Sequence, residues 1–311
     1  MNKTPLHSVP EHAEHTRRRT STPARRPRGR RLLKGVAAAG AAAAAYMMFE
    51  AQWIECREKT LVVPGFPPEW SGLRVLHLSD VHAGDFGLNL VSLRRAVAWA
   101  IPLEPDLVFL TGDILGDPGS SGRYLAELSG LSPTLGAYSV TGNHEYGIAK
   151  GPLARARDTS ELWAQAGITL LQDRCVRLCP RASSGPLPRG GANLLVCGAD
   201  YLTGGFELLE SGSAAKVPAG DFPILLVHEP PTPDDPLQDR FPLTFAGHTH
   251  GGQLRVPGLR GLIPLNEEDG EHLGGTYNWG NGLLVVSRGV GTSFVPFRLL
   301  TRPEATLWRL V

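Results

Sequence analysis

The sequence predicts an α/β fold, and two features of the apolar pattern support that prediction. Between residues 60 and 170, short apolar runs alternate with amphipathic stretches, which is typical of strands separated by helices. Further along, apolar runs follow one another without helical stretches between them, which indicates a mixed sheet or a second sheet. A length of 311 residues suits one large domain or two small ones.

The expected strands are short apolar runs bounded by polar residues, glycine or proline. They are Thr60–Val63, Leu73–Leu78, Asp106–Thr111, Gly136–Val140, Ile168–Leu171, Asn193–Gly198, Phe222–Val227, Leu243–Ala246, Gly282–Ser287 and Ala305–Leu310. Asn89–Ala100 and Asp158–Ala166 have the spacing of amphipathic helices, and Arg123–Leu131 has a weaker form of it. The stretch Arg181–Gly191 is rich in Pro, Gly and Ser, so we expect a loop there.

The N-terminal part differs in composition from the rest of the chain. Residues 1–31 are rich in Arg and Pro and are predicted to form a disordered basic tail. Residues 32–49 are mostly apolar, and three interpretations of them remain open. They are a single membrane anchor with its basic end in the cytoplasm, a cleaved export signal in which Arg30-Arg31 is close to a twin-arginine motif, and an Ala-rich soluble helix.

The first two interpretations have the same consequence for the location of the folded domain, which we expect over residues 60–311. In both, the domain lies on the non-cytoplasmic side of the membrane. We therefore expect a protein of the cell inner membrane with a single N-terminal anchor and an extracytoplasmic domain, with export by a cleaved signal as the alternative.

The net charge of +1 hides an asymmetry along the chain. Residues 1–34 carry a net charge of +8 and the remaining residues −7, so the basic excess belongs to the tail. An acidic body argues against long nucleic acid as a partner, and no specific nucleic-acid binding is expected.

The four cysteines are too few for a dense disulfide framework, and no second Cys/His pair completes a zinc site with Cys175 and Cys179. We expect ordinary buried or partly buried thiols.

Polar residues follow five of the expected strands directly. The segments are Ser79-Asp80-Val81-His82, Thr111-Gly112-Asp113, Thr141-Gly142-Asn143-His144-Glu145, His228-Glu229-Pro230 and Gly247-His248-Thr249-His250. Because sheets of this kind bind ligands beyond the carboxyl ends of their strands, we expect these side chains to meet in one crevice. The glycines within the segments permit the tight turns that this requires.

The side chains in these segments are suited to metal binding. Imidazole, carboxylate and amide groups together favour Zn, Mn or Fe over Ca or Mg, which prefer oxygen ligands only. Seven ligand residues fill eight positions if one carboxylate bridges two metal ions. Two divalent ions, two aspartates and a bridging hydroxide leave a charge of about +1, which matches an anionic phosphate. The sequence contains neither a Gly-x-Ser-x-Gly elbow nor a phosphate-cradling glycine loop.

In order and spacing, the five segments resemble the calcineurin-like metallophosphoesterase superfamily over about residues 60–311. The apolar N-terminal segment and the stretch from Arg288 to Glu304 are most similar to its membrane-associated bacterial phosphodiesterase branch. The resemblance implies a four-layer αββα sandwich with two mixed β-sheets and a metal site at the carboxyl ends of the strands.

The resemblance also implies a role for each matching residue. It assigns one metal ion to Asp80, His82 and His250, the other to Asn143, His228 and His248, and the bridging position to Asp113. It implies that His144 does not bind metal but protonates the leaving oxygen or stabilises the developing charge. Glu145 is then either the residue that orients His144 or a solvated or structural residue.

The implied activity is metal-dependent hydrolysis of phosphodiester or pyrophosphate bonds by two divalent ions and a metal-bridging hydroxide. The expected substrate is a phosphate ester, either a small molecule or a lipid, and a lipid- or nucleotide-linked substrate at the membrane is one option. The related branch includes enzymes that cleave UDP-diacylglucosamine, which motivates the lipid option. A nuclease or cyclic-nucleotide phosphodiesterase is the alternative, and an inactive scaffold is disfavoured because all seven ligands are present.

Two segments bear on specificity. Gly116 stands where serine/threonine phosphatases of this superfamily carry the second Asp of Gly-Asp-x-x-Asp, which argues against a protein phosphatase. The segment Gly274–Gly280 is either a loop over the active site, with Tyr277 and Trp279 stacking on the substrate, or a surface loop with half-buried aromatics.

Overall fold

The structure is a computed structural model that describes residues 28–116, 122–148, 160–180, 191–205, 217–232, 234–256 and 271–311. Most of the expected basic tail and of the expected loop Arg181–Gly191 lies outside these residues. Helix α1 (Arg28–Glu50) begins in the last residues of the expected tail and continues through the apolar segment. Its part Arg31–Glu50 is long and apolar enough to cross a membrane, a test that a signal sequence also passes.

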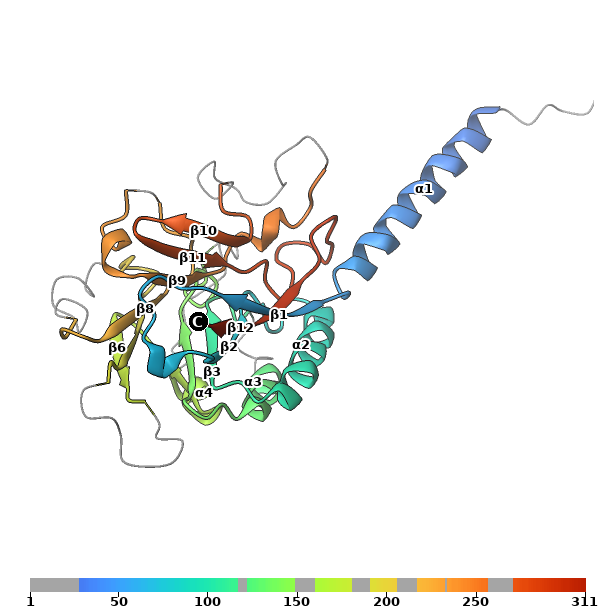
Figure 1. Cartoon of the computed structure of the whole chain (residues 1–311). Coiled ribbons are helices and arrows are strands. Elements are labelled where there is room, and N and C mark those ends of the chain that lie inside the picture. The colour runs from blue at the N-terminus through green and yellow to red at the C-terminus, as the bar shows by residue number, and fades with distance from the viewer. Residues whose placement is uncertain are drawn as a thin grey trace, which may run out of the picture. The chain divides into compact units, whose positions relative to one another are not determined.

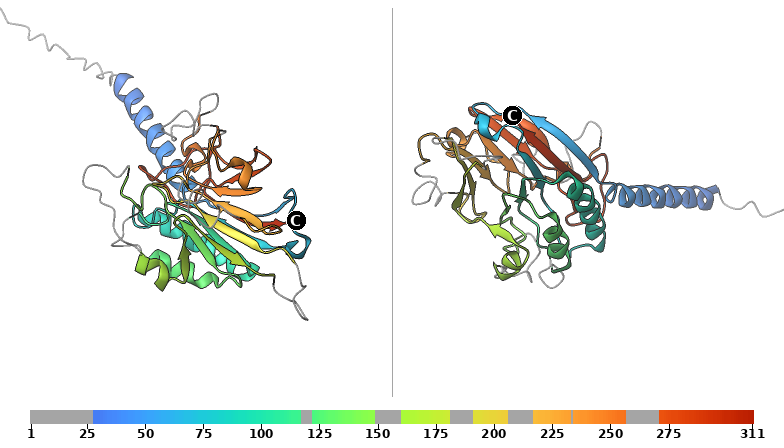
Figure 2. Two further views of the ribbon diagram at one scale, coloured as in Figure 1. Left: turned by 90° about the vertical axis from the view of Figure 1, so that its left-hand side faces the viewer. Right: turned by 60° about the horizontal axis from the view of Figure 1, so that its bottom comes forward.

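The chain divides into two compact units, Met1–Ala42 and Ala43–Val311. The second unit contains two six-stranded sheets (Figures 1 and 2). The order in the first sheet is β1 (Glu55–Leu61), β12 (Glu304–Leu310), β2 (Arg74–Leu78), β3 (Leu107–Thr111), β4 (Ala137–Val140) and β5 (Ile168–Leu170). The order in the second is β10 (Gly275–Trp279), β11 (Gly282–Val286), β9 (Leu243–Ala246), β8 (Phe222–Leu226), β7 (Leu194–Gly198) and β6 (Arg174–Leu178).

Both sheets are mixed. In the first sheet β2, β3, β4 and β5 are parallel neighbours, and β12 runs antiparallel to β2. In the second sheet β7, β8, β9 and β11 are parallel neighbours, while β6 and β10 run antiparallel at its two edges. The carboxyl ends of the parallel strands therefore lie at one end of each sheet, where a ligand site is expected.

Three α-helices cover the first sheet on the side away from the second (Figure 1). They are α2 (Gly87–Ala100), α3 (Gly122–Leu128) and α4 (Ser160–Gln165). Short 3-10 helices are η1 (Pro68–Trp70), η2 (Ile101–Leu103), η3 (Ser129–Leu131), η4 (Gln238–Arg240) and η5 (His250–Gly252). The expected helix Arg123–Leu131 is thus α3 followed by η3, within a residue of its expected bounds.

The alternation of side chains along β3 shows how the core is built. Leu107 and Phe109 face the second sheet, whereas Val108 and Leu110 face the helices. Phe109 packs edge-on against Phe245 of β9, with ring centroids 5.3 Å apart. Parallel strands covered on both faces require such continuous apolar runs. The predicted sandwich of two mixed sheets with helices is confirmed; in the described residues, the outer face of the second sheet is covered by the segment that contains η4.

Sequence reasoning was least successful at the sheet edges. Strand β1 begins at Glu55 and ends at Leu61, not over the expected Thr60–Val63, and β6 was not expected at all. The segment Gly274–Gly280, expected to be a loop, contains the edge strand β10. Trp279 is buried there and donates its indole N–H to the Thr232 carbonyl at 3.3 Å, so it does not cover an active site. An edge strand buries less apolar surface, and its sequence signal is weaker.

The expectation of ordinary thiols was wrong for two of the cysteines. Cys175 of β6 and Cys197 of β7 face each other in the antiparallel register and form a disulfide. Cys56 and Cys179 are free. The pairing depends on the register of β6, a strand that the apolar pattern did not reveal.

Candidate active site

The five polar segments converge at the carboxyl ends of five strands. Segments 79–82, 111–113 and 141–145 follow the neighbouring parallel strands β2, β3 and β4. Segments 228–230 and 247–250 follow β8 and β9, which pack against β3 from the other sheet. The segments therefore meet at the junction of the two sheets, and the seven candidate metal ligands and His144 are brought together there.

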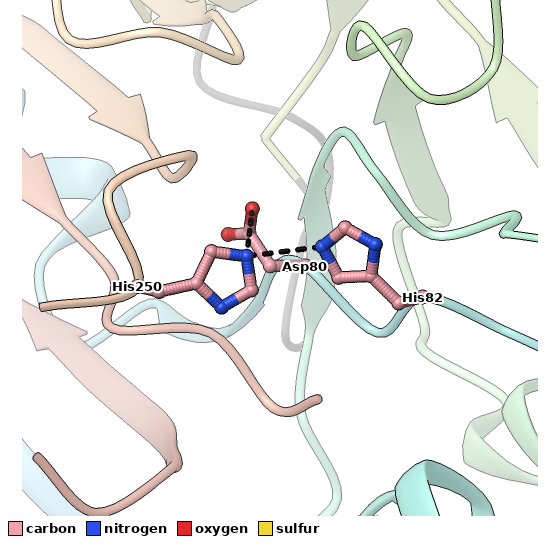
Figure 3. A group of neighbouring side chains, drawn as sticks. All are labelled: Asp80, His82 and His250. Carbon is pink, nitrogen blue, oxygen red and sulfur yellow. Dashed lines mark hydrogen bonds and ion pairs between the residues drawn. The ribbon is translucent and has the colours of Figure 1, made fainter. Parts of the chain in front are cut away.

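The first cluster contains Asp80, His82 and His250 (Figure 3). The Nε2 atoms of His82 and His250 lie 3.0 Å apart, and Nε2 of His250 lies 3.5 Å from Oδ1 of Asp80. All three side chains are buried. Two imidazoles and a carboxylate that point at one another form a donor set that suits Zn, Mn or Fe.

The second cluster contains Asn143, His228 and His248. Nε2 of His228 lies 3.1 Å from Oδ1 of Asn143 and 3.1 Å from Nδ1 of His248. The other ring nitrogen of His228, Nδ1, donates to the Thr111 carbonyl at 2.9 Å, which fixes the ring and directs Nε2 towards the cluster. Burial opposes protonation of His228, but Asp113 outweighs it and raises the pKa of His228 to about 10. The negative charge of Asp113 therefore acts directly on this cluster.

Asp113 lies between the two clusters. Its Oδ2 atom is 3.5 Å from Nε2 of His228 and 3.7 Å from Nε2 of His82. Burial opposes ionisation of Asp113, but His228 and His144 hold its pKa well below the usual range. Its other oxygen, Oδ1, accepts the backbone N–H of His144 at 2.8 Å. One oxygen of a stably ionised carboxylate thus faces both clusters, which is the position that a bridging ligand requires.

Most of the candidate ligands have left-handed backbone conformations. The φ angles are +50° at Asp80, +48° at His82, +51° at Asp113, +70° at His248 and +49° at His250. Such conformations cost on the order of 1 kcal/mol or more each for residues other than glycine, and they are typical of functional sites. The folded sheets therefore hold these side chains in place against a local backbone preference.

Two glycines beside Asp113 allow this close packing. Gly112 has a φ angle of +81°, and a Cβ there would come 2.5 Å from Nδ1 of His228. A Cβ on Gly142 would collide with Oδ1 of Asp113. The expectation that Gly112 permits a tight turn is confirmed. Gly142 is required mainly because the carboxylate of Asp113 lies too close for a side chain at that position.

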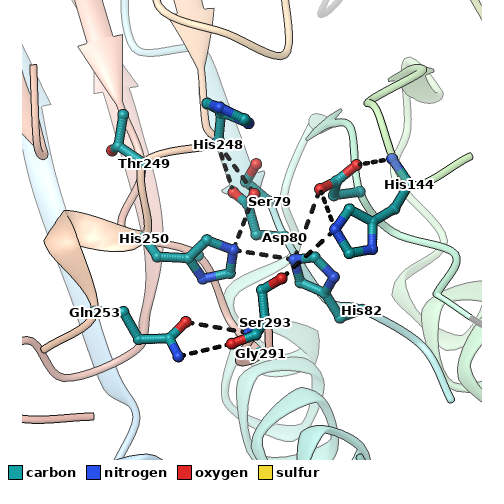
Figure 4. Close-up of polar contacts among 12 residues, drawn as sticks. Ser79, Asp80, His82, His144, His248, Thr249, His250, Gln253, Gly291 and Ser293 are labelled. Atoms are coloured by element: carbon teal, nitrogen blue, oxygen red, sulfur yellow. Dashed lines mark hydrogen bonds and ion pairs between the residues drawn. The ribbon is translucent and has the colours of Figure 1, made fainter. Parts of the chain in front are cut away.

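His144 lies beside His82 of the first cluster (Figure 4). It also contacts a residue that sequence reasoning missed, Asp85. Oδ2 of Asp85 lies 3.2 Å from Nδ1 of His82 and 3.5 Å from Nδ1 of His144. One carboxylate oxygen can thus orient both rings. Asp85 follows His82 by three residues and ends no apolar run, so the pattern that identified the other residues did not include it.

Glu145 is structural rather than a partner of the His144 ring. Its carboxylate accepts backbone N–H groups from Asp113 at 3.0 Å, Leu115 at 2.8 Å and Gly142 at 2.7 Å. These bonds join the segment after β3 to the segment after β4. The structure therefore supports a structural role for Glu145 and not the orientation of the His144 ring.

Gly116 explains how Asp85 reaches this position. A Cβ at position 116 would come 2.5 Å from Oδ1 of Asp85 and 2.9 Å from the Ala83 carbonyl. Because position 116 has no side chain, the carboxylate of Asp85 can lie against it.

Arg298 is a second residue that sequence reasoning missed. It is fully buried, and its guanidinium donates to Nδ1 of His250 at 3.2 Å and to the Gly291 carbonyl at 2.6 Å. Burial lowers the pKa of Arg298 to about 9. Since arginine only donates, a neutral His250 ring carries its proton on Nε2, facing His82.

A two-sheet sandwich with imidazole and carboxylate clusters at the strand ends is the architecture of a metal-dependent phosphoesterase. The family model of the calcineurin-like phosphoesterases matches residues 73–252, and the chain belongs to this family. It is therefore a metallophosphoesterase, a hydrolase of phosphoric esters, and its His/Asp clusters could hold metal ions.

Three curated relatives are similar in sequence to most of this chain. Phosphodiesterase YaeI of Escherichia coli is 31% identical over 91% of this chain and 98% of its own length. The uncharacterized metallophosphoesterase YkuE of Bacillus subtilis is 28% identical over 90% of this chain and 93% of its own length. A transmembrane protein with metallophosphoesterase domain from Danio rerio is 29% identical over 78% of this chain and 54% of its own length.

Proposed function

We propose that this protein hydrolyses phosphodiester or pyrophosphate bonds with a dinuclear metal centre and a hydroxide nucleophile. The observation that carries the proposal is the position of Asp113, whose Oδ2 atom lies within 3.7 Å of a candidate ligand from each cluster. A shared carboxylate between two donor sets is the arrangement of a two-metal site. The phosphodiesterase activity named for the YaeI relative supports the choice of a diester.

The side chains have distinct roles in this proposal. Bound metal ions would supply an activated hydroxide from water and neutralise the charge of the phosphate. Asp80, His82 and His250 would hold one ion, Asn143, His228 and His248 would hold the other, and Asp113 would contribute to both.

His144 donates a proton to the leaving oxygen and does not bind metal. Its Nε2 atom faces the site, 3.8 Å from Oδ2 of Asp113, while Nδ1 faces Asp85. Asp85 therefore holds the ring so that Nε2 is directed towards the leaving oxygen.

For the location, we propose an inner-membrane protein whose folded domain lies outside the cytoplasm, with a cleaved signal as the alternative. The apolar helix Arg31–Glu50 and the basic residues before it support an N-terminal anchor. The disulfide between Cys175 and Cys197 supports an oxidising compartment, because cytoplasmic thiols are kept reduced. A phosphate ester, either a small molecule or a lipid presented at the membrane, is the proposed substrate.

The direct test is hydrolysis of bis(p-nitrophenyl) phosphate by the full chain before and after chelation. We expect chelation to abolish turnover and added Mn²⁺ or Zn²⁺ to restore it. The variant Asp113→Asn serves as the matched control, because it should remain inactive when the same metal is added. Full activity of the metal-free wild-type protein would exclude the proposed mechanism.

A further inference from the structure

The segment of residues 291–295 lies beside His144. Gln253 fixes this segment from one side. Its side-chain nitrogen donates to the Ser293 carbonyl at 2.9 Å, and its side-chain oxygen accepts the Ser293 N–H at 3.1 Å (Figure 4). The same nitrogen donates to the Val295 carbonyl at 3.1 Å. Gln253 and Ser293 are both buried. Because Gln253 directly follows η5, which begins with His250, the segment is tied to a candidate metal ligand.

A second amide fixes the segment from the other side. The side-chain oxygen of Asn89 accepts the backbone N–H of Thr292 at 3.1 Å. The side-chain nitrogen of the same Asn89 donates to the His82 carbonyl at 3.1 Å. Asn89 and Thr292 are both buried. The segment therefore has a fixed position relative to ligands from both sheets.

Phe294 is the residue that this segment presents to solvent. Its φ angle is +59°, an uncommon and unfavourable conformation for an aromatic residue, and half of its surface is exposed (50%). Its ring centroid lies 6.3 Å from that of His144, and the neighbouring Ser293 hydroxyl lies 3.5 Å from Nε2 of His144. A strained and exposed aromatic ring contributes little to folding, whereas strain held in place by the surrounding structure is typical of ligand contacts.

We propose that Phe294 forms the apolar wall of a leaving-group subsite, so that the preferred substrates are phosphodiesters with an apolar leaving group. The inference rests on the proposed function, in which His144 protonates the leaving oxygen. The group attached to that oxygen must then lie beside His144, where Phe294 offers its ring. A hydrophobic contact at this point favours an apolar group over a hydrated one.

The test compares two diesters that share a p-nitrophenyl leaving group and differ in the other ester group. They are bis(p-nitrophenyl) phosphate and methyl p-nitrophenyl phosphate. In the metal-loaded full chain, Phe294→Ala should lower kcat/KM for both substrates by the same factor, about fivefold. Leu300→Ala is the matched control: Leu300 has a φ angle of +56° and is 55% exposed, and its replacement should change neither value.

A second readout does not depend on activity. Phe294→Gly removes the backbone strain, so its thermal midpoint should rise by about 2 °C while kcat/KM falls as it does in Phe294→Ala. A loss confined to bis(p-nitrophenyl) phosphate would place Phe294 beside the other ester group and contradict the inference. A fall in thermal midpoint, or unchanged kcat/KM, would also contradict it. An inactive wild-type protein would contradict the proposed function instead.

Discussion

Oδ2 of Asp85 lies 3.5 Å from Nδ1 of His144 and 3.2 Å from Nδ1 of His82. A single carboxylate therefore contacts both the candidate proton donor and a candidate metal ligand. Apart from its interaction with Asp85, Nδ1 of His144 has no hydrogen-bond partner in the described residues. The orientation of the His144 ring thus depends on a residue that lies outside the five segments identified from the sequence.

The first prediction concerns this relationship. Asp85→Asn keeps the size of the side chain but removes the carboxylate that contacts and orients the ring of His144. At saturating metal, we expect kcat to fall roughly tenfold for aryl diesters with poor leaving groups and much less for p-nitrophenyl esters, which need little protonation. The measurement is the dependence of kcat on the pKa of the leaving phenol, which should steepen in the variant.

The double variant Asp85→Asn/His144→Ala provides the control for this prediction. If Asp85 acts through His144, the double variant should be no slower than His144→Ala alone. Independent losses that multiply, or a loss that is equal for all leaving groups, would assign Asp85 a general structural role.

The second prediction concerns pH and the buried His77 of β2, whose Nε2 lies 2.9 Å from the Thr111 hydroxyl. Burial lowers the pKa of His77 to about 3, whereas an unfolded chain titrates near pH 6.5. Above pH 6.5 both states are neutral and His77 has no effect. Below it only the unfolded state binds the proton, so stability is lost as the pH falls towards 3, by about 1.4 kcal/mol per pH unit.

Replacing His77 by phenylalanine should remove this contribution. The free energy of unfolding, measured by urea denaturation between pH 4 and 6, should fall less steeply with decreasing pH in His77→Phe. The edge-on contact with Phe245 can be kept by the new ring, since the present rings are 5.1 Å apart. Equal slopes for the two proteins would show that His77 takes up its proton in the folded state.

The third prediction concerns the disulfide. It links residues separated by 22 positions, and constraining an unfolded loop of this length stabilises the folded state by about 3 kcal/mol. Cys175→Ala/Cys197→Ala should lower the free energy of unfolding by about that amount, and a reducing agent should affect only the wild-type protein. Cys179→Ala, which removes an exposed free thiol, is the control and should have little effect. Equal stability of the double variant and the wild type would argue against a stabilising bridge.

The success and failure of sequence reasoning follow from where each residue lies. Asp80, Asp113 and His228 could be identified because they directly follow strands buried on both faces, whose apolar runs are unmistakable. The strand bounds in the interior of the sheets agree with expectation to within one or two residues. Edge strands such as Glu55–Leu61 carry several charged side chains and lack that signal.

The sequence pattern could not identify residues whose role depends on contacts that form only in the folded chain. Arg298 lies 48 residues from His250, and its role appears only because the segment that carries it folds back onto η5. Asp85 could have been noticed as an acidic residue near His82, but its contact with His144 requires the space above Gly116. The same holds for Cys175, whose partner is set by the register of an edge strand.

The most direct test of the dinuclear site is metal content, measured together with turnover in two variants. The wild-type protein should bind about two metal ions per chain. Asp113→Asn should lose both ions to a large extent, since it removes the oxygen shared by the clusters. His144→Ala should retain about two ions while its kcat falls at least about a hundredfold. Equal metal loss in the two variants, or a single ion in the wild-type protein, would contradict the account.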